Sequence, residues 1–200
     1  MGKIYDTIDE HLVAWIGRQS MFFVASAPAG ADGHINLSPK GPIQTLRILD
    51  ERTVAYLDLV GSGAETIAHV RENGRIVLMF CAFEGPPRIV RLHGRGEYVL
   101  AGDPRYDELI AERELSADVP DEARRAVVIV SLTRVSDSCG YGVPLMSFAG
   151  TRPHTRAWAE KRLRTGGPDA LIAYQQEKNA RSIDGLPAVE PLDGSVLSSS

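Results

Sequence analysis

The feature that most constrains this chain is a series of short apolar or alternating runs separated by turn residues. The longer runs occupy residues 21–27, 53–59, 75–82, 88–100 and 126–135, and shorter ones occupy 35–38 and 44–49. Turn-forming residues such as Pro28 and Asp50 stand between them. Many short strands joined by turns are typical of an antiparallel barrel. We therefore predict a mainly β fold (α+β) with about six strands and flanking helices.

Helical signals interrupt the strand pattern at the beginning, in the middle and at the end of the chain. They lie at residues 6–17, 62–72, 103–114, 158–163 and 169–180. Thr7 with Glu10, and Ser62 with Glu65, have the spacing of a capping box. Gly94 lies inside a strand and predicts a bulge or a barrel corner. The absence of regular strand–helix alternation and of a Gly-x-Gly-x-x-Gly motif argues against a dinucleotide-binding Rossmann fold.

Length and charge limit the remaining classes. The 200 residues suit one domain with helical decoration, and we predict a β domain at 1–150 followed by a helical extension and a Ser-rich tail at 151–200. The net charge of −4 argues against a bulk grip on nucleic acid or an anionic membrane. The first residues lack a signal-peptide pattern, and no apolar stretch is long enough to cross a bilayer. We expect a cytoplasmic protein.

The two cysteines, Cys81 and Cys139, form no CxxC pair and lie near no histidine cluster, so we expect neither a disulfide framework nor a metal site. No Ser–His–Asp or paired-carboxylate arrangement stands out. The segment 136–146 is rich in glycine and proline and follows a long strand, which predicts a loop over the end of the barrel. Within it we expect Cys139 to be buried and inert, with a reactive thiol as the alternative.

The first candidate binding segment runs from Asn36 to Gly41 with the sequence Asn-Leu-Ser-Pro-Lys-Gly. A strand that leads into these residues offers a hydroxyl group, a compact cation and an approachable backbone. Phosphate oxygens and the edges of flavin rings accept such donors. The alternative is an ordinary polar turn with a solvated lysine.

The second candidate runs from Gly61 to Thr66, where a helix opens directly after a strand behind a Gly-Ser-Gly loop. Free backbone N–H groups and the positive end of the helix dipole suit an anion. The alternative is a simple capped helix, since capping accounts for Ser62 and Glu65. The carboxylate of Glu65 repels a phosphate unless it points away.

The third candidate is the strand that begins at Arg88. Strand alternation places Ile89, Arg91, His93 and Arg95 on one face if Gly94 makes no bulge. Such a face suits a phosphate or the carboxylates of a partner, and the alternative is a solvated or interface surface.

In order along the chain, these segments resemble the pyridoxamine 5′-phosphate oxidase-like FMN-binding family. The resemblance rests on residues 22–26 (Phe-Phe-Val-Ala-Ser), 33–41 (Gly-His-Ile-Asn-Leu-Ser-Pro-Lys-Gly), 55–58 (Ala-Tyr-Leu-Asp), 61–63 (Gly-Ser-Gly), 65–69 (Glu-Thr-Ile-Ala-His), 75–80 (Arg-Ile-Val-Leu-Met-Phe) and 88–94 (Arg-Ile-Val-Arg-Leu-His-Gly). It covers residues 10–135, and the sequence of 136–187 is similar to one bacterial subgroup.

The resemblance implies a six-stranded antiparallel split β-barrel of the FMN-binding type. It also implies a homodimer that holds FMN in clefts at the subunit interface. The residues that it assigns to the cofactor are Asn36, Leu37, Ser38, Pro39, Lys40, Gly41, Asp58, Ser62, Gly63, Thr66 and Arg91.

Three departures argue against the oxidase reaction that names the family. Glu65-Thr66 stands where the oxidase has an Arg-Lys pair, Ile89 stands near the place of a glutamine, and no C-terminal segment rich in tryptophan and arginine is present. We therefore expect an FMN-dependent oxidoreductase that acts on another small molecule, with residues 139–146 as a wall of its substrate pocket. The alternatives are a non-catalytic flavin-binding or sensing protein, or a relative that binds F420 or haem in the same cleft.

Overall fold

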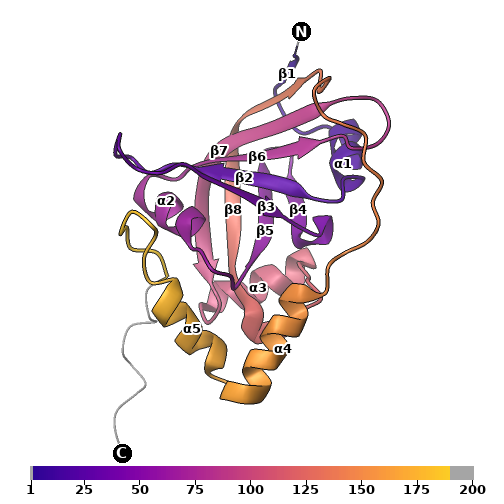
Figure 1. Ribbon diagram of the computed structural model, residues 1–200. Helices are drawn as coiled ribbons and strands as arrows, with labels where there is room; N and C mark the ends of the chain where they lie inside the picture. The colour runs from indigo at the N-terminus through magenta and orange to yellow at the C-terminus, as the bar shows by residue number, and fades with distance from the viewer. Residues whose placement is uncertain (1, 190–200) are drawn as a thin grey trace, which may run out of the picture.

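The computed structural model describes residues 2–189 and has one antiparallel sheet with helices packed around it (Figure 1). The strands are β1 (Ile4–Tyr5), β2 (Phe22–Ser26), β3 (Asn36–Lys40), β4 (Leu46–Asp50), β5 (Thr53–Leu59), β6 (Arg75–Cys81), β7 (Ile89–Leu100) and β8 (Arg124–Ser138). The helices are α1 (Glu10–Gly17), α2 (Glu65–Asn73), α3 (Pro104–Arg113), α4 (His154–Gly166) and α5 (Ala170–Lys178), with short 3-10 helices η1 (Ile43–Thr45) and η2 (Asp121–Ala123). The predicted mainly β fold with flanking helices is confirmed.

Hydrogen bonds join the strands in the order β3-β2-β6-β7-β8-β5-β4, and β1 pairs with β8 outside this path. Every pairing is antiparallel. The described residues hold eight strands, so the predicted number of six is wrong. The order also ends at β3 and β4, which does not make a clear six-stranded barrel. Seven of the strands coincide with the seven runs seen in the sequence, and the eighth, β1, has only two residues, too few to leave a periodic pattern.

The two longest strands, β7 and β8, run side by side and contain the predicted bulge. Their register slips between His93 and Gly94, so that Thr133 of β8 is passed over. A Cβ atom at Gly94 would collide with the backbone oxygen of Ser131. The prediction for Gly94 is therefore confirmed, because only glycine admits the neighbouring backbone so closely.

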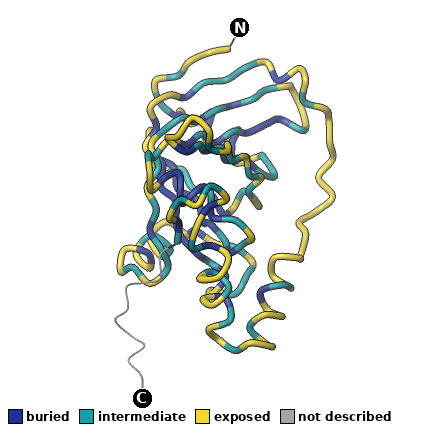
Figure 2. Tube along the Cα trace, turned by 60° about the vertical axis from the view of Figure 1, so that its left-hand side comes forward, coloured by how far each residue is buried: buried dark blue, intermediate teal, exposed yellow. Residues whose placement is uncertain are grey.

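The main core is formed by side chains from the strands of the curved sheet and from helix α1. Figure 2 shows buried segments gathered in the interior of the molecule. Alternate residues of β2 are buried, as expected for a strand with one face toward the core. The ring of Phe22 lies 5.6 Å from that of Tyr56 and 5.8 Å from that of Phe80. A second apolar cluster packs α3 against β5, β7 and β8.

Helix α1 begins one turn later than the sequence suggested. The side chain of Asp9 accepts the backbone N–H of Leu12 at 2.8 Å and caps the helix. The capping box predicted for Thr7 and Glu10 is therefore wrong. Asp9 carries out the same task with a carboxylate, which also favours the positive end of the helix dipole.

After β8 the chain runs along the surface from residue 139 to 153 before α4 begins, and Figure 2 shows this stretch mostly exposed. Cys139 is exposed, so the expectation that it is buried is wrong, whereas Cys81 is buried. Helices α4 and α5 pack together beneath the sheet through Trp158 and Tyr174, whose ring centroids lie 5.1 Å apart. The predicted Ser-rich tail, 194–200, lies outside the described residues. None of the helices in residues 2–189 has the length and apolar character needed to span a membrane.

Candidate functional site: a cavity at the start of helix α2

A cavity of about 310 Å³ lies between β3, the end of β5 and the start of α2. It is lined by Asn36, Ser38, Pro39, Lys40, Leu59, Gly61, Ser62, Gly63, Ala64, Glu65, Thr66 and Arg125. Seven of the eleven residues predicted to bind the cofactor are among them: Asn36, Ser38, Pro39, Lys40, Ser62, Gly63 and Thr66. The fold therefore brings the first two candidate segments of the sequence together in one site.

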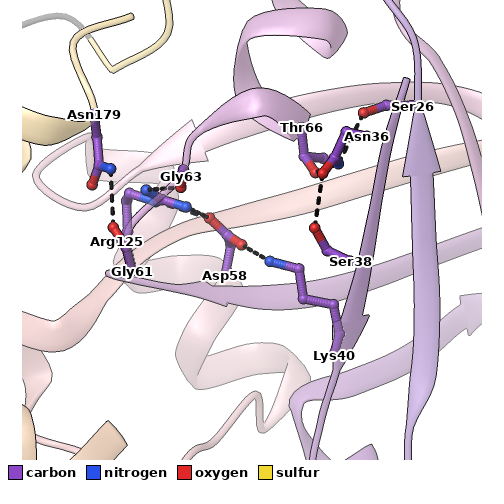
Figure 3. A network of polar contacts seen from close by, with 10 residues as sticks. All are labelled: Ser26, Asn36, Ser38, Lys40, Asp58, Gly61, Gly63, Thr66, Arg125 and Asn179. Atoms are coloured by element: carbon purple, nitrogen blue, oxygen red, sulfur yellow. Dashed lines mark hydrogen bonds and ion pairs between the residues drawn. The ribbon is translucent and has the colours of Figure 1, made fainter. Parts of the chain in front are cut away.

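Strand β3 supplies one polar wall of the cavity. The side chain of Asn36 donates to Thr66 Oγ1 at 3.0 Å and to Ser26 Oγ at 3.3 Å. The hydroxyl of Ser38 in turn donates to Asn36 Oδ1 at 2.9 Å. This chain of hydrogen bonds ties β3 to the first turn of α2 and holds the polar groups of both elements in fixed positions (Figure 3).

An ion-pair cluster forms the second wall. Lys40 Nζ lies 2.7 Å from Asp58 Oδ1, and Arg125 donates to Asp58 Oδ2 through Nε at 2.9 Å and Nη2 at 2.7 Å. The side chains of Asp58 and Arg125 are only 1% and 4% exposed, while that of Lys40 is 22% exposed. Burial alone would raise the pKa of Asp58, but Arg125 and Lys40 outweigh it and lower the pKa to about 2. Two cations on one carboxylate leave the cluster with one net positive charge.

The start of α2 supplies the third wall and lacks the cap that the sequence suggested. Its N-cap residue is Ala64, which has no side-chain hydrogen bond to the helix, so the capping box predicted for Ser62 and Glu65 is wrong. The first-turn N–H groups therefore keep their donor capacity at the edge of the cavity. Arg125 Nη1 donates to Gly63 O at 3.0 Å and anchors the preceding loop to the ion-pair cluster.

Glu65 places a carboxylate in the same cavity. A Cβ atom added to Gly63 would collide with the Glu65 carboxylate, so this side chain folds back over the loop. Only the flexible end of the Glu65 side chain is involved, so a larger residue at position 63 would displace the carboxylate. The carboxylate opposes the positive charge of the Lys40–Asp58–Arg125 cluster and lowers the attraction of the site for an anion.

Four predicted cofactor residues do not line this cavity. Leu37 points to the other side of β3 and is 62% exposed, and Gly41 packs against Ser20 and Met21. Asp58 lies beneath the cavity as the centre of the ion-pair cluster. Arg91 donates to Ser138 Oγ at 3.1 Å on the neighbouring strand, away from the cavity.

Sequence reasoning missed two residues that organise the site, Arg125 and Asn179. Arg125 stands directly before an apolar strand core, and a charge at such a place is the signal that could have drawn attention to it. Asn179 follows α5 and donates through Nδ2 to Gly61 O at 3.0 Å. It left no signal, since its partner lies 118 residues away in the chain.

A second cavity of about 780 Å³ lies next to the beginning of β2, where Ser20 and Met21 line it. It is lined largely by apolar side chains such as Trp15, Met21 and Phe148, and Arg88 borders it. Of the predicted pocket wall 139–146, only Met146 lines this cavity, and residues 139–145 line neither of the two. The lining of the larger cavity is therefore more apolar than that of the smaller one, although Arg18 and Arg88 border it.

The structure thus combines an antiparallel β domain with a polar cavity at a strand–loop–helix junction, lined by Lys40, Arg125 and Glu65. The family model described as Pyridoxamine 5′-phosphate oxidase matches residues 8–139. The chain is 39% identical to the pyridoxamine 5′-phosphate oxidase family protein ustO of Aspergillus flavus over 202 aligned residues. The alignment covers 94% of this chain and 78% of that protein. The chain belongs to the pyridoxamine 5′-phosphate oxidase family, as the resemblance in its sequence indicated.

Two solved structures are similar at low identity. One is the FAD binding protein from Mycobacterium smegmatis, with a TM-score of 0.48, 14% identity, and coverage of 68% of this chain and 96% of that one. The other is an FMN-binding protein from Syntrophomonas wolfei, with a TM-score of 0.42, 14% identity, and coverage of 60% and 78%.

Proposed function

We propose that this chain is an FMN-binding protein of the split-barrel type and a flavin-dependent oxidoreductase that acts on a small molecule. The observation that carries the proposal is the uncapped start of α2, which opens into a cavity beside Lys40 and Arg125. Backbone N–H groups at a helix start, together with two cations, are the donors that a phosphate dianion prefers. The cavity volume of about 310 Å³ is at the lower end of the range for small-ligand sites.

The residues of the chain would bind and orient the cofactor. Lys40, Arg125 and the N–H groups of the Ser62–Thr66 segment would hold its phosphate, while Asn36 and Ser38 would meet polar groups further along it. A bound flavin supplies hydride or electron transfer, so the protein need contribute only position and electrostatics. This fits a cavity whose described lining offers no nucleophile–base pair.

We also propose that two copies of the chain assemble into a homodimer, and the family resemblance implies that the flavin lies near their interface. The supporting observation is the surface segment after β8, where Tyr141, Leu145 and Phe148 are 82%, 78% and 59% exposed. Neighbouring apolar side chains that stay in contact with water are typical of an interaction surface. Sedimentation at micromolar concentration tests this directly, and a monomer would contradict it.

The absorption spectrum of the purified protein, with FMN, FAD and riboflavin titrated in turn, tests the cofactor. We expect the bands of oxidised flavin and a preference for FMN over riboflavin, because riboflavin lacks the phosphate. Haem or deazaflavin bands would instead support the alternative cofactors. A colourless protein that refuses added FMN contradicts the proposal.

Turnover separates an enzyme from a carrier. Bleaching of the bound flavin by NADH or NADPH faster than that of free FMN supports an oxidoreductase. A bound flavin that is reduced no faster than free FMN favours a non-catalytic flavin-binding protein.

A further inference from the structure

Asn179 is fully buried although it lies in the C-terminal segment, beyond the residues that the family model matches. Its backbone is held on both sides, because its N–H donates to Gln175 O at 2.7 Å and its carbonyl accepts from Val189 at 3.0 Å. Its side chain reaches Gly61 at the beginning of the Gly61–Gly63 loop (Figure 3). The C-terminal segment thus contacts the loop through the side chain of a residue whose backbone is held in place.

The hydrogen bond from Asn179 determines the direction of the Gly61–Ser62 peptide. A trans peptide unit is planar, so its C=O and N–H groups point in opposite directions. The carbonyl of Gly61 points to Asn179, which does not line the cavity, whereas Ser62 does. The N–H of Ser62 therefore points away from Asn179, and within residues 2–189 no backbone carbonyl accepts it.

We propose that Asn179 is a positioning residue that orients the N–H of Ser62 toward the phosphate of the bound flavin. This rests on the proposed function. A loop with two glycines has a large conformational entropy, and ordering it on binding costs affinity. Asn179 fixes the carbonyl of Gly61 and Arg125 fixes that of Gly63, so the loop is ordered before the ligand arrives.

The segment that carries Asn179 is itself anchored on α2. Ala188 packs on Ala64 and Ala68 in a small apolar cluster and donates to Ala180 O at 2.9 Å. Within the same segment, Ser182 Oγ accepts from the N–H groups of Asp184 and Leu186 at 3.3 and 3.2 Å. Ser182 therefore stabilises the segment without contact to the loop, which makes it a matched control for Asn179.

The test compares FMN and riboflavin affinities of the wild type, Asn179→Leu and Ser182→Ala by fluorescence quenching. Leucine has a similar shape but no donor, so we expect FMN affinity to fall about tenfold while riboflavin affinity stays close to that of the wild type. Ser182→Ala should bind both flavins as the wild type does. If the leucine variant fails to fold, Asn179→Ser replaces it, since its shorter side chain cannot reach Gly61.

The outcomes separate the inference from the proposed function. Wild-type protein that binds no flavin contradicts the proposed function, and the inference falls with it. Wild-type protein that binds FMN, with a variant that binds it equally well or loses both flavins in parallel, overturns only the role of Asn179. A loss confined to FMN supports it.

Discussion

Two arginine–aspartate pairs in this chain have the same contacts and opposite surroundings. Arg125 donates through Nε and Nη2 to one oxygen of Asp58, and Arg88 donates through the same two atoms to one oxygen of Asp137. The first pair is 4% and 1% exposed, and the second is 26% and 18% exposed. Only the first has an additional cation, Lys40, on the same carboxylate.

The difference indicates separate roles. A fully buried ion pair gains little net stability over packed apolar residues, because desolvation offsets the attraction between the charges. Its presence beside the cavity therefore favours a binding role. The Arg88–Asp137 pair instead contacts Tyr5 of β1, whose hydroxyl donates to Asp137 at 2.6 Å and accepts from Arg88. These hydrogen bonds hold β1 against β8. That arrangement serves the fold.

The largest effect is expected when each arginine is removed in turn. Arg125→Met leaves the carboxylate of Asp58 buried with only Lys40, and we expect a loss of about 3–5 kcal/mol in the free energy of unfolding. Arg88→Met leaves Asp137 partly solvated, and we expect a loss of at most about 1 kcal/mol. Urea unfolding of the two variants measures the difference. Equal losses would remove the distinction between the pairs.

Acid should affect the buried pair in a defined range of pH. The pKa of Asp58 falls from 3.8 to about 2 in the folded state, which corresponds to about 2 kcal/mol. Because the folded pKa is the lower one, this stabilisation is complete above about pH 4 and disappears as the pH falls toward 2. Wild type and Asp58→Asn should thus differ most in the free energy of unfolding near pH 5 and converge near pH 2. A constant difference across this range would contradict the ionised pair.

Lys40 tests whether the additional cation serves the ligand. Lys40→Ala leaves Asp58 with both bonds from Arg125, so we expect stability to fall by about 1 kcal/mol. FMN affinity should fall about tenfold through the loss of one cation–phosphate contact. Arg91→Ala is the control, since Arg91 was predicted for the same site but lies outside the cavity at the start of α2. Equal FMN affinities of the Lys40 variant and the wild type would remove Lys40 from the site.

The sequence predicted the elements of this site better than its internal contacts. Strand β3 and helix α2 were foreseen, because alternation and turn residues are local signals, and α2 ends at Gly74, whose φ of 71° suits a glycine. The capping box was predicted wrongly because Ser62 and Glu65 have the spacing that the motif requires. In the structure, the carbonyls of Gly61 and Gly63 in this loop instead accept hydrogen bonds from the distant side chains of Asn179 and Arg125. Arg125 pairs with Asp58 across 67 residues, and no local pattern records such a contact.

Arg91 shows the opposite error. Strand alternation predicted which face of the strand Arg91 occupies, and the structure pairs it with Met79 of β6 and Ser136 of β8. Alternation says nothing about which surface that face of the sheet meets. The position of a site on a sheet depends on how the sheet curves and which helix covers it. Tertiary packing decides both.

The smallest effect in this series concerns Glu65, the one anion in the cavity lining. Glu65→Gln keeps the shape of the side chain and removes its charge, so we expect FMN affinity to rise about threefold while riboflavin affinity stays unchanged. The helix should lose up to about 1 kcal/mol, because a carboxylate in the first turn favours the helix dipole. The gain should shrink at high salt, since screening weakens the repulsion between Glu65 and the phosphate. Equal gains for both flavins would show that the carboxylate acts through the shape of the loop and not through its charge, and the cluster around Asp58 alone would then account for the preference for a phosphate.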